Sequence, residues 1–255
     1  FTFTRLLSLE STLTDVSDKS LPNLIRISQP YGQAARLLES TEMLSKSTSD
    51  SSKRLAEQQL KANLINIRKA AQEIFANEFL DTQLNTIAIE LSEFSALIEE
   101  RLQTIDKIEL LTAQMYQLNA QAINIEKQNS SDWVLGFSQV SVDVSRALLE
   151  NKLQRVRFLF NQLQKKLNEL SANSAKQQHQ AIGLQLTNQF KTLLFSENGM
   201  EALKIKSLSL EGRALGRENF VHNLIQDYVA QLGFVTYETE QNITTQVAAS
   251  VGDMK

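Results

Sequence analysis

The chain contains neither glycine nor proline between Gly32 and Gly136, and this run constrains the fold more than any other feature. Both prolines, Pro22 and Pro30, precede the run, and the 255 residues include only eight glycines. Average proteins contain roughly 7% glycine and 5% proline, much of it in turns. A chain with so few breakers has few turns, so the sequence predicts long helices.

Apolar residues recur at intervals of three and four along the run, as in helices that pack side by side. The longest predicted helix begins at a cap at Asp81 and ends near Gln128. Its apolar row keeps a heptad alternation at both ends, but the spacing changes between Ile98 and Leu111. We therefore expect this helix to pass from one bundle into another there, with Ile105 at a local irregularity. The row consists of Leu84, Ile87, Leu91, Phe94, Ile98, Leu102, Ile105, Ile108, Leu111, Met115, Leu118, Ala122 and Ile125.

Caps and breakers delimit the other predicted helices. Ser20 is a good cap for the second helix, where Pro30 predicts a kink near Ile27. Asp50 or Ser51 is expected to cap the third. The remaining breaks are predicted at polar runs and glycines. The predicted helices cover about 3–17, 20–46, 51–79, 81–128, 130–170, 173–195, 199–210 and 218–250.

Two details qualify this pattern. The alternating stretch VSVDVS at 140–145 is the only strand-like patch, and we interpret it as a helix with a distortion next to Gly136. Gly212 and Gly216 predict a turn before the last helix. The predicted fold is all-α, with long antiparallel helices that form two coaxially stacked four-helix bundles and share the long helices.

Catalytic and metal-binding patterns are not found. The chain has no cysteine, and its two histidines, His179 and His222, have no ligand at metal spacing. The segment EGRALGREN at 211–219 lacks the lysine and hydroxyl residue of a phosphate-binding loop and follows no predicted strand. We interpret it as a turn in which Arg213 and Arg217 hold an anion or a carboxylate. We expect no catalytic residue, no metal and no cofactor.

The net charge of −3 provides no general attraction for nucleic acid. A basic cluster on one predicted helix has few aromatic neighbours, so we interpret it as a face that is either solvated or engaged in salt bridges between helices. No run approaches the ~18 apolar residues that a membrane span needs. The chain opens on Phe-Thr-Phe-Thr-Arg without an initiator methionine, so we expect a fragment whose membrane spans lie outside both ends. The basic cluster consists of Lys152, Arg155, Arg157, Lys165 and Lys166.

Two turns, 47–52 and 128–133, are candidate tips for contact with a partner. Trp133 and Phe137 follow the second turn, where they either plug the end of a bundle or contact another protein. The partner-contact candidates are Ser47, Asp50, Lys53, Trp133 and Phe137. The candidate sites of irregularity in signalling are Pro30, Ile105 and Gly136.

A loose motif near the N-terminus carries a resemblance to a known family. It consists of Leu21-Pro22-x-Leu24, Ala34-Ala35-x-Leu37, Leu44-Ser45 and Ser47-Thr48, followed by Arg54, Leu60, Leu64 and Ile67. With the length and the all-helical content, it resembles the periplasmic sensor domains of bacterial sensor histidine kinases that respond to trimethylamine N-oxide. The motif covers less than a fifth of the chain, whereas the likeness in architecture covers all of it.

This resemblance implies that residues 1–255 form one periplasmic sensor domain between two membrane spans. It implies a homodimer that detects trimethylamine N-oxide through a periplasmic ligand-binding protein rather than by enclosing the ligand. The phospho-acceptor histidine motif and the ATP-binding motifs of the kinase are missing, so no kinase activity is expected.

Two other functions are compatible with the sequence. A helical bimodular domain of a chemoreceptor binds carboxylic acids directly, and an inward cluster of arginine or threonine in one bundle would favour this function. Arg26, Arg36 and Arg68 are candidates for such a cluster. A cytosolic helical scaffold is the second alternative, and a full-length sequence without flanking apolar spans would favour it.

Overall fold

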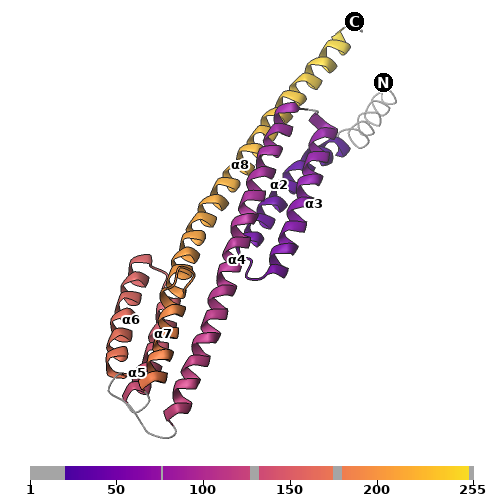
Figure 1. Cartoon of the computed structure of the whole chain (residues 1–255). Coiled ribbons are helices and arrows are strands. Elements are labelled where there is room, and N and C mark those ends of the chain that lie inside the picture. The colour runs from indigo at the N-terminus through magenta and orange to yellow at the C-terminus, as the bar shows by residue number, and fades with distance from the viewer. Residues whose placement is uncertain (1–20, 76, 127–131, 175–179, 253–255) are drawn as a thin grey trace, which may run out of the picture. The chain divides into compact units, whose positions relative to one another are not determined.

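The computed structural model describes residues 21–75, 77–126, 132–174 and 180–252 (Figure 1). These ranges contain helices and no strand, so the all-α prediction is confirmed. None of the described helices is both long and apolar enough to cross a bilayer. The predicted helix at 3–17 lies outside the described residues. The helices are α2 (Leu21–Ser45), α3 (Asp50–Phe75), α4 (Glu78–Glu126), α5 (Asp132–Leu149), α6 (Leu153–Ser174), α7 (Gln180–Phe195) and α8 (Met200–Gly252).

The chain divides into two compact units. Unit 1 contains the described residues up to Ile98 and those from Ala214 onward, and unit 2 is Glu99–Arg213. Helices α4 and α8 therefore contribute to both units. The passage of α4 from unit 1 to unit 2 falls at the start of the stretch where the heptad spacing changes.

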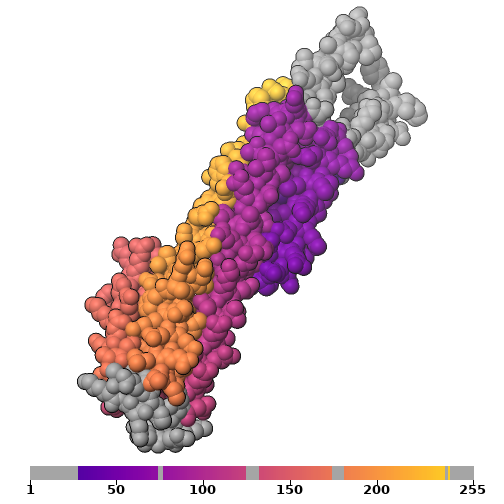
Figure 2. Space-filling view, viewed as in Figure 1, coloured from indigo at the N-terminus to yellow at the C-terminus, as the bar shows by residue number. Residues whose placement is uncertain are grey.

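Unit 1 is a bundle of α2, α3, the first half of α4 and the second half of α8. In Figure 2 the atoms of α3 and of the first half of α4 adjoin one another on the visible face of unit 1. Its largest fully buried side chains include Leu37, Ile67, Leu84, Phe94 and Tyr228. Burial of such side chains stabilises the fold by about 1.5–3 kcal/mol each.

A polar contact joins each neighbouring pair of helices in unit 1. Together these contacts close a ring from α2 to α3, α4, α8 and back to α2, as expected for four helices around one core. The contacts are Asn63 Nδ2 to Ser40 Oγ at 2.7 Å, Arg68 Nη2 to Asn85 Oδ1 at 2.5 Å, Arg217 Nη2 to Glu93 Oε2 at 2.7 Å, and Ser45 Oγ to Glu218 Oε2 at 2.6 Å.

Unit 2 contains the second half of α4, the first part of α8, and α5, α6 and α7. The stretch 130–170, predicted as one helix, instead folds as α5 and α6 with a break at Glu150–Lys152. The carboxylate of Glu150 accepts hydrogen bonds from the backbone N–H groups of Asn151 (3.0 Å) and Lys152 (3.1 Å). A side chain thus satisfies backbone donors at the start of α6, and no glycine or proline is needed. The VSVDVS stretch is helical, as predicted.

The predicted caps of α3 and α4 are wrong by a few residues. Ser49 caps α3, because its Oγ accepts from the N–H of Ser52 at 3.2 Å while Ser52 Oγ accepts from the N–H of Ser49 at 3.1 Å. Asn77 caps α4, since its Oδ1 accepts from the N–H groups of Phe79 (2.9 Å) and Leu80 (3.3 Å). Asp81, the predicted cap, lies inside the first turns of α4.

The turn predicted at Gly212 and Gly216 is wrong as well, because α8 runs through both residues. Leu210, Ala214 and Val221 are buried along this part of the helix. Burial of this face outweighs the cost of about 1 kcal/mol for each glycine in a helix.

The apolar row predicted for α4 is the face that packs inward, and its burial varies along the helix. It is fully buried through Leu102, half-buried at Ile105, Ile108 and Leu111, and buried again at Met115 and Ala122. The half-buried part coincides with the change in heptad spacing.

The hydroxyl of Tyr228 gives a test of the unit 1 core. It is fully buried and has no hydrogen-bond partner among the described residues. Burial raises the pKa of this phenol above its ordinary value, an effect that Asp81 enhances and Arg68 opposes. We expect Tyr228→Phe to raise the free energy of unfolding by about 1 kcal/mol, because it removes an unpaired polar atom. Chemical denaturation measures this change, with the exposed Tyr237→Phe as the control.

The pH dependence has a defined sign. Above pH ~10 the unfolded tyrosine ionises while the buried one stays protonated, so the stability of the wild type falls as pH rises further. The variant lacks this contribution, and its advantage over the wild type grows above that pH. A lower stability of Tyr228→Phe at neutral pH would show that the hydroxyl has a stabilising partner.

Candidate interaction and signalling sites

The turn between α2 and α3 carries three partner-contact candidates, and the structure uses two of them internally. Ser47 is buried and donates from its Oγ to the carbonyl of Met43 at 3.0 Å. The side chain of Lys53 is only 12% exposed, with its Nζ 3.0 Å from Glu57 Oε1. Asp50 alone of the three is exposed.

Glu57 ties this turn to α4, since its Oε1 accepts a hydrogen bond from the hydroxyl of Ser95. Burial raises the pKa of Glu57, but the hydrogen bonds from Ser95 and Lys53 outweigh it and hold the pKa below its usual value. Because Ser95 lies one turn before Ile98, the α2–α3 turn is at the end of unit 1 where α4 leaves the bundle.

Trp133 and Phe137 are both buried in unit 2, so the exposed position considered for them is wrong. Their ring centroids are 5.1 Å apart, and Phe137 meets Phe190 of α7 edge-on at 4.8 Å. Such aromatic pairs add about 0.5–1.5 kcal/mol beyond area burial. These rings join α5 to α7, as expected of a plug within the bundle.

The three candidate sites of irregularity lie in different settings. Pro30 is a buried residue inside α2, and Ile105 lies in the half-buried part of α4. The kink predicted near Ile27 stays a prediction. At Gly136 an added Cβ would lie 2.7 Å from Cδ2 of Leu170. This glycine therefore allows α5 to approach α6 closely.

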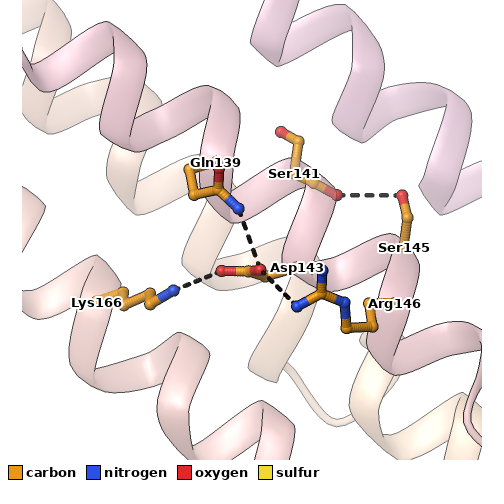
Figure 3. A network of polar contacts seen from close by, with 6 residues as sticks. All are labelled: Gln139, Ser141, Asp143, Ser145, Arg146 and Lys166. Carbon is orange, nitrogen blue, oxygen red and sulfur yellow. Dashed lines mark hydrogen bonds and ion pairs between the residues drawn. The ribbon is translucent and has the colours of Figure 1, made fainter.

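A polar network links α5 to α6 on the surface of unit 2 (Figure 3). Asp143 accepts from Lys166 Nζ at 2.5 Å and from Gln139 Nε2 at 3.3 Å, and Arg146 Nη1 lies at 3.8 Å. Lys166 thus forms a salt bridge, as predicted for the basic cluster. The guanidinium of Arg155 lies over Phe158 at 5.6 Å.

Ion pairs connect α4 with α8 in both units. In unit 1, Arg217 binds both Glu90 and Glu93, and its hydrogen bond to Glu90 raises the pKa of the guanidinium. In unit 2, Lys206 lies 2.7 Å from Glu100, and this hydrogen bond lowers the pKa of the carboxyl.

The sequence prediction for Arg217 was correct in part. A carboxylate does hold this arginine, but on a helix rather than in a turn. Its partners, Glu90 and Glu93, were not predicted. Their distance from Arg217 along the chain hid the pairing.

An open cleft of about 930 Å³ lies between α4 and α7 in unit 2. Three leucines, Leu118, Leu184 and Leu193, contribute to its wall. None of the described residues that line it is charged, so they offer amide groups and apolar surface but no cation for a carboxylate ligand. The side-chain amides around it come from Gln114, Gln117, Gln121, Gln185, Asn188 and Gln189.

The arginines required for direct carboxylate sensing do not form an inward cluster among the described side chains. Arg36 is exposed, and Arg68 donates to Asn85 on the bundle surface. The side chain of Arg26 and all of His179 lie outside the described residues. His222 is half-buried and its Nε2 has no partner. No group of acidic, histidine or cysteine residues in the described part of the chain has the arrangement of a metal site.

Comparison with solved structures defines the class of protein to which this fold is similar: the sensor domains of histidine kinases. The particular neighbours are two structures of the sensor domain of TorS. The TorS sensor domain of V. parahaemolyticus superimposes with a TM-score of 0.75 at 12% identity, over 84% of this chain and 99% of that one. The TorS sensor domain in complex with TorT, in the presence of TMAO, gives a TM-score of 0.70 at 11% identity, over 83% and 97% of the two chains.

The sequence itself finds no such match. No protein-family model fits the chain, and no curated protein matches it. At this level of identity the likeness establishes the fold, and it extends over both units.

The close approach at Gly136 predicts an unusual response to alanine. At Gly212 an added Cβ meets nothing within 4 Å, so Gly212→Ala should raise the free energy of unfolding by about 0.5–1 kcal/mol. Gly136→Ala should raise the free energy of unfolding by a smaller amount or lower it, because Leu170 must move. Denaturant unfolding of both variants measures the difference.

A double-mutant cycle isolates the cause. In the Leu170→Ala background, Gly136→Ala should raise the free energy of unfolding as much as Gly212→Ala does, since the colliding methyl group is absent. An equal gain at both glycines in the wild-type background would contradict the close approach.

Proposed function

We propose that this chain is the extracytoplasmic sensor domain of a two-component histidine kinase. The observation that carries the proposal is the fold likeness to TorS sensor domains, which spans both units and nearly the full length of those domains. On this proposal the domain lies in the periplasm, as part of an inner-membrane protein with transmembrane helices at both ends. The domain itself has no kinase activity, and catalysis belongs to the cytoplasmic part.

The proposed stimulus is trimethylamine N-oxide, presented by a TorT-like periplasmic binding protein. One of the solved neighbours is a complex of a TorS sensor domain with TorT in the presence of TMAO. Asp50, the exposed member of the candidates at the α2–α3 turn, remains a candidate contact for this protein.

Direct sensing of a carboxylate by the domain alone has less support. None of the described residues that line the cleft is a cation, Arg36 is exposed, and Arg68 donates to Asn85. The cleft still gives direct binding of an uncharged polar ligand a defined location, so the experiment below includes the domain alone.

Signal transfer is proposed to follow α4 and α8. Both helices cross the boundary between the units without a break, and an ion pair joins them in each unit. Repacking in one unit would then rotate or shift a helix that continues into the other. In a full-length kinase, Gly136→Ala is expected to reduce the response by stiffening α5, measured as TMAO-dependent autophosphorylation.

Calorimetric titration of trimethylamine N-oxide tests the proposal most directly. The titration is carried out with the domain alone, with a purified TorT-type protein alone, and with the two together. We expect no heat from the domain alone, and a TMAO-dependent complex when both proteins are present. Heat from the domain alone, abolished by substitution of Gln117 and Gln185 in the cleft, would instead establish direct sensing.

A further inference from the structure

The cleft between α4 and α7 in unit 2 differs from an ordinary solvated helix surface. Eleven described residues line it and none of them is charged, although 22% of the whole chain is charged. Exposed helix faces normally carry charged side chains. The cleft lies against the core of unit 2, because Leu118 lines the cleft and also packs on that core. It is therefore an uncharged surface with apolar support.

Six side-chain amides line the cleft, three from α4 and three from α7. No hydrogen bond within the described part of the chain engages any of these six side chains. Each amide offers N–H donors and a carbonyl acceptor in one plane. A ligand that satisfies amides on both walls therefore has to present donors and acceptors side by side along its length, as a peptide backbone does.

Two leucines of α7 set a spacing along the cleft. Leu184 and Leu193 are nine residues apart, which is about 14 Å along the helix axis. An extended peptide rises about 3.3–3.4 Å per residue, and its alternate side chains point the same way. Side chains i and i+4 of such a peptide are therefore about 13 Å apart and on one side of it. Their separation matches that of the two leucines.

The size of the cleft suits the same kind of ligand. The stretch of α7 that lines it, from Ala181 to Leu193, is about 18 Å long, which is the length of about five residues of extended chain. The volume of about 930 Å³ equals the share of roughly 30 water molecules in the liquid, which is too large for a packing defect. No aromatic ring is among the described lining residues, so they offer no flat apolar surface on which a sugar ring could stack.

We propose that the cleft between α4 and α7 binds a short oligopeptide in extended conformation, about five residues long and with uncharged side chains. The side-chain amides of the two helices hydrogen-bond to its backbone from both sides, and its apolar side chains at alternate positions contact Leu118, Leu184 and Leu193. The ligand is uncharged because the lining has no charge to pair with an ionic group taken out of water. This ligand is distinct from trimethylamine N-oxide, and its binding does not depend on the proposed function.

Calorimetric titration of the 255-residue chain with acetyl-Leu-Ser-Leu-Ser-Leu-amide tests the site. We expect saturable binding, and Gln117→Ala combined with Gln185→Ala should raise the Kd roughly tenfold, since each change removes hydrogen bonds to the peptide backbone. The matched control is Gln164→Ala combined with Asn168→Ala, two exposed amides of α6 outside the cleft, which should leave the Kd unchanged. Circular dichroism checks that all variants fold. An absence of saturable binding, or an equal effect of the two double variants, would overturn the site.

Changes in the ligand test how it is held. The peptide acetyl-Leu-Pro-Leu-Pro-Leu-amide keeps the three apolar side chains but lacks two backbone N–H donors, so its Kd should be roughly tenfold higher. Maltopentaose, an uncharged sugar of similar length, should give no heat of binding. Equal affinity for the two peptides would overturn recognition of the backbone. Binding of maltopentaose but not of the serine peptide would overturn the class of ligand.

A blocking variant separates a free peptide from a segment of a partner protein. Ala181→Trp should abolish peptide binding by filling the cleft without removing an amide, and its exposed position leaves the core unchanged. If the free peptide does not bind, but Ala181→Trp abolishes TMAO-dependent binding of the TorT-type protein, the cleft belongs to that protein and the free peptide ligand is overturned. Saturable peptide binding in a chain that gives no response to TMAO and TorT-type protein supports the site and contradicts the proposed stimulus.

Discussion

The structure depends on one geometric constraint: α4 and α8 each have to fit two hydrophobic cores. A helix turns by about 100° per residue, so the row that faces the core of unit 1 does not automatically face the core of unit 2. In α4 the row is buried through Leu102, half-buried at Ile105, Ile108 and Leu111, and buried again at Met115 and Ala122. The change of spacing in the sequence is where the helix adjusts its inward face between the two cores.

The polar contacts between the helices of unit 1 are not part of its apolar core. They lie around the bundle, one for each neighbouring pair of helices, and they determine which helices are neighbours more than they add stability, because exposed contacts of this kind contribute little. Polar atoms inside the bundle, in contrast, do affect its stability. Tyr228, Gln33 and Gln83 each have a buried polar atom with no hydrogen-bond partner in the described part of the chain. Such atoms lower stability and leave the core of unit 1 open to rearrangement.

Much of the helical pattern followed from local rules. The ends of α2, the turn before α3 and the inward row of α4 were predictable, because breakers and apolar spacing act within a few residues. The break between α5 and α6 was not, since the group that makes it possible is the carboxylate of Glu150, which looks like any helical glutamate in the sequence. The continuity of α8 was not predicted either. Two glycines suggested a turn, but α8 stays helical there because one of its faces is buried against other helices.

The candidate sites were harder to predict than the helices. Asp50 is exposed as a contact residue should be, but Ser47 and Trp133 are buried, and burial depends on which helices pack nearby. Arg217 was singled out correctly as a cation that needs an anion. Its partners Glu90 and Glu93 lie 127 and 124 residues away, since 217 − 90 = 127 and 217 − 93 = 124. Such a pairing follows only once the register of α4 against α8 is known.

Gly212 and Gly216 have a consequence for the cooperativity of the molecule. They lie on either side of the Arg213–Ala214 boundary between the units, in a part of α8 where nothing packs against them. The helix is intrinsically weakest there, so opening of its backbone hydrogen bonds costs least at the point where one core ends and the other begins. A helix of 53 residues need not then melt as one cooperative element. Each half can exchange its amide hydrogens with the stability of its own unit, and one unit can lose its structure while the other keeps it.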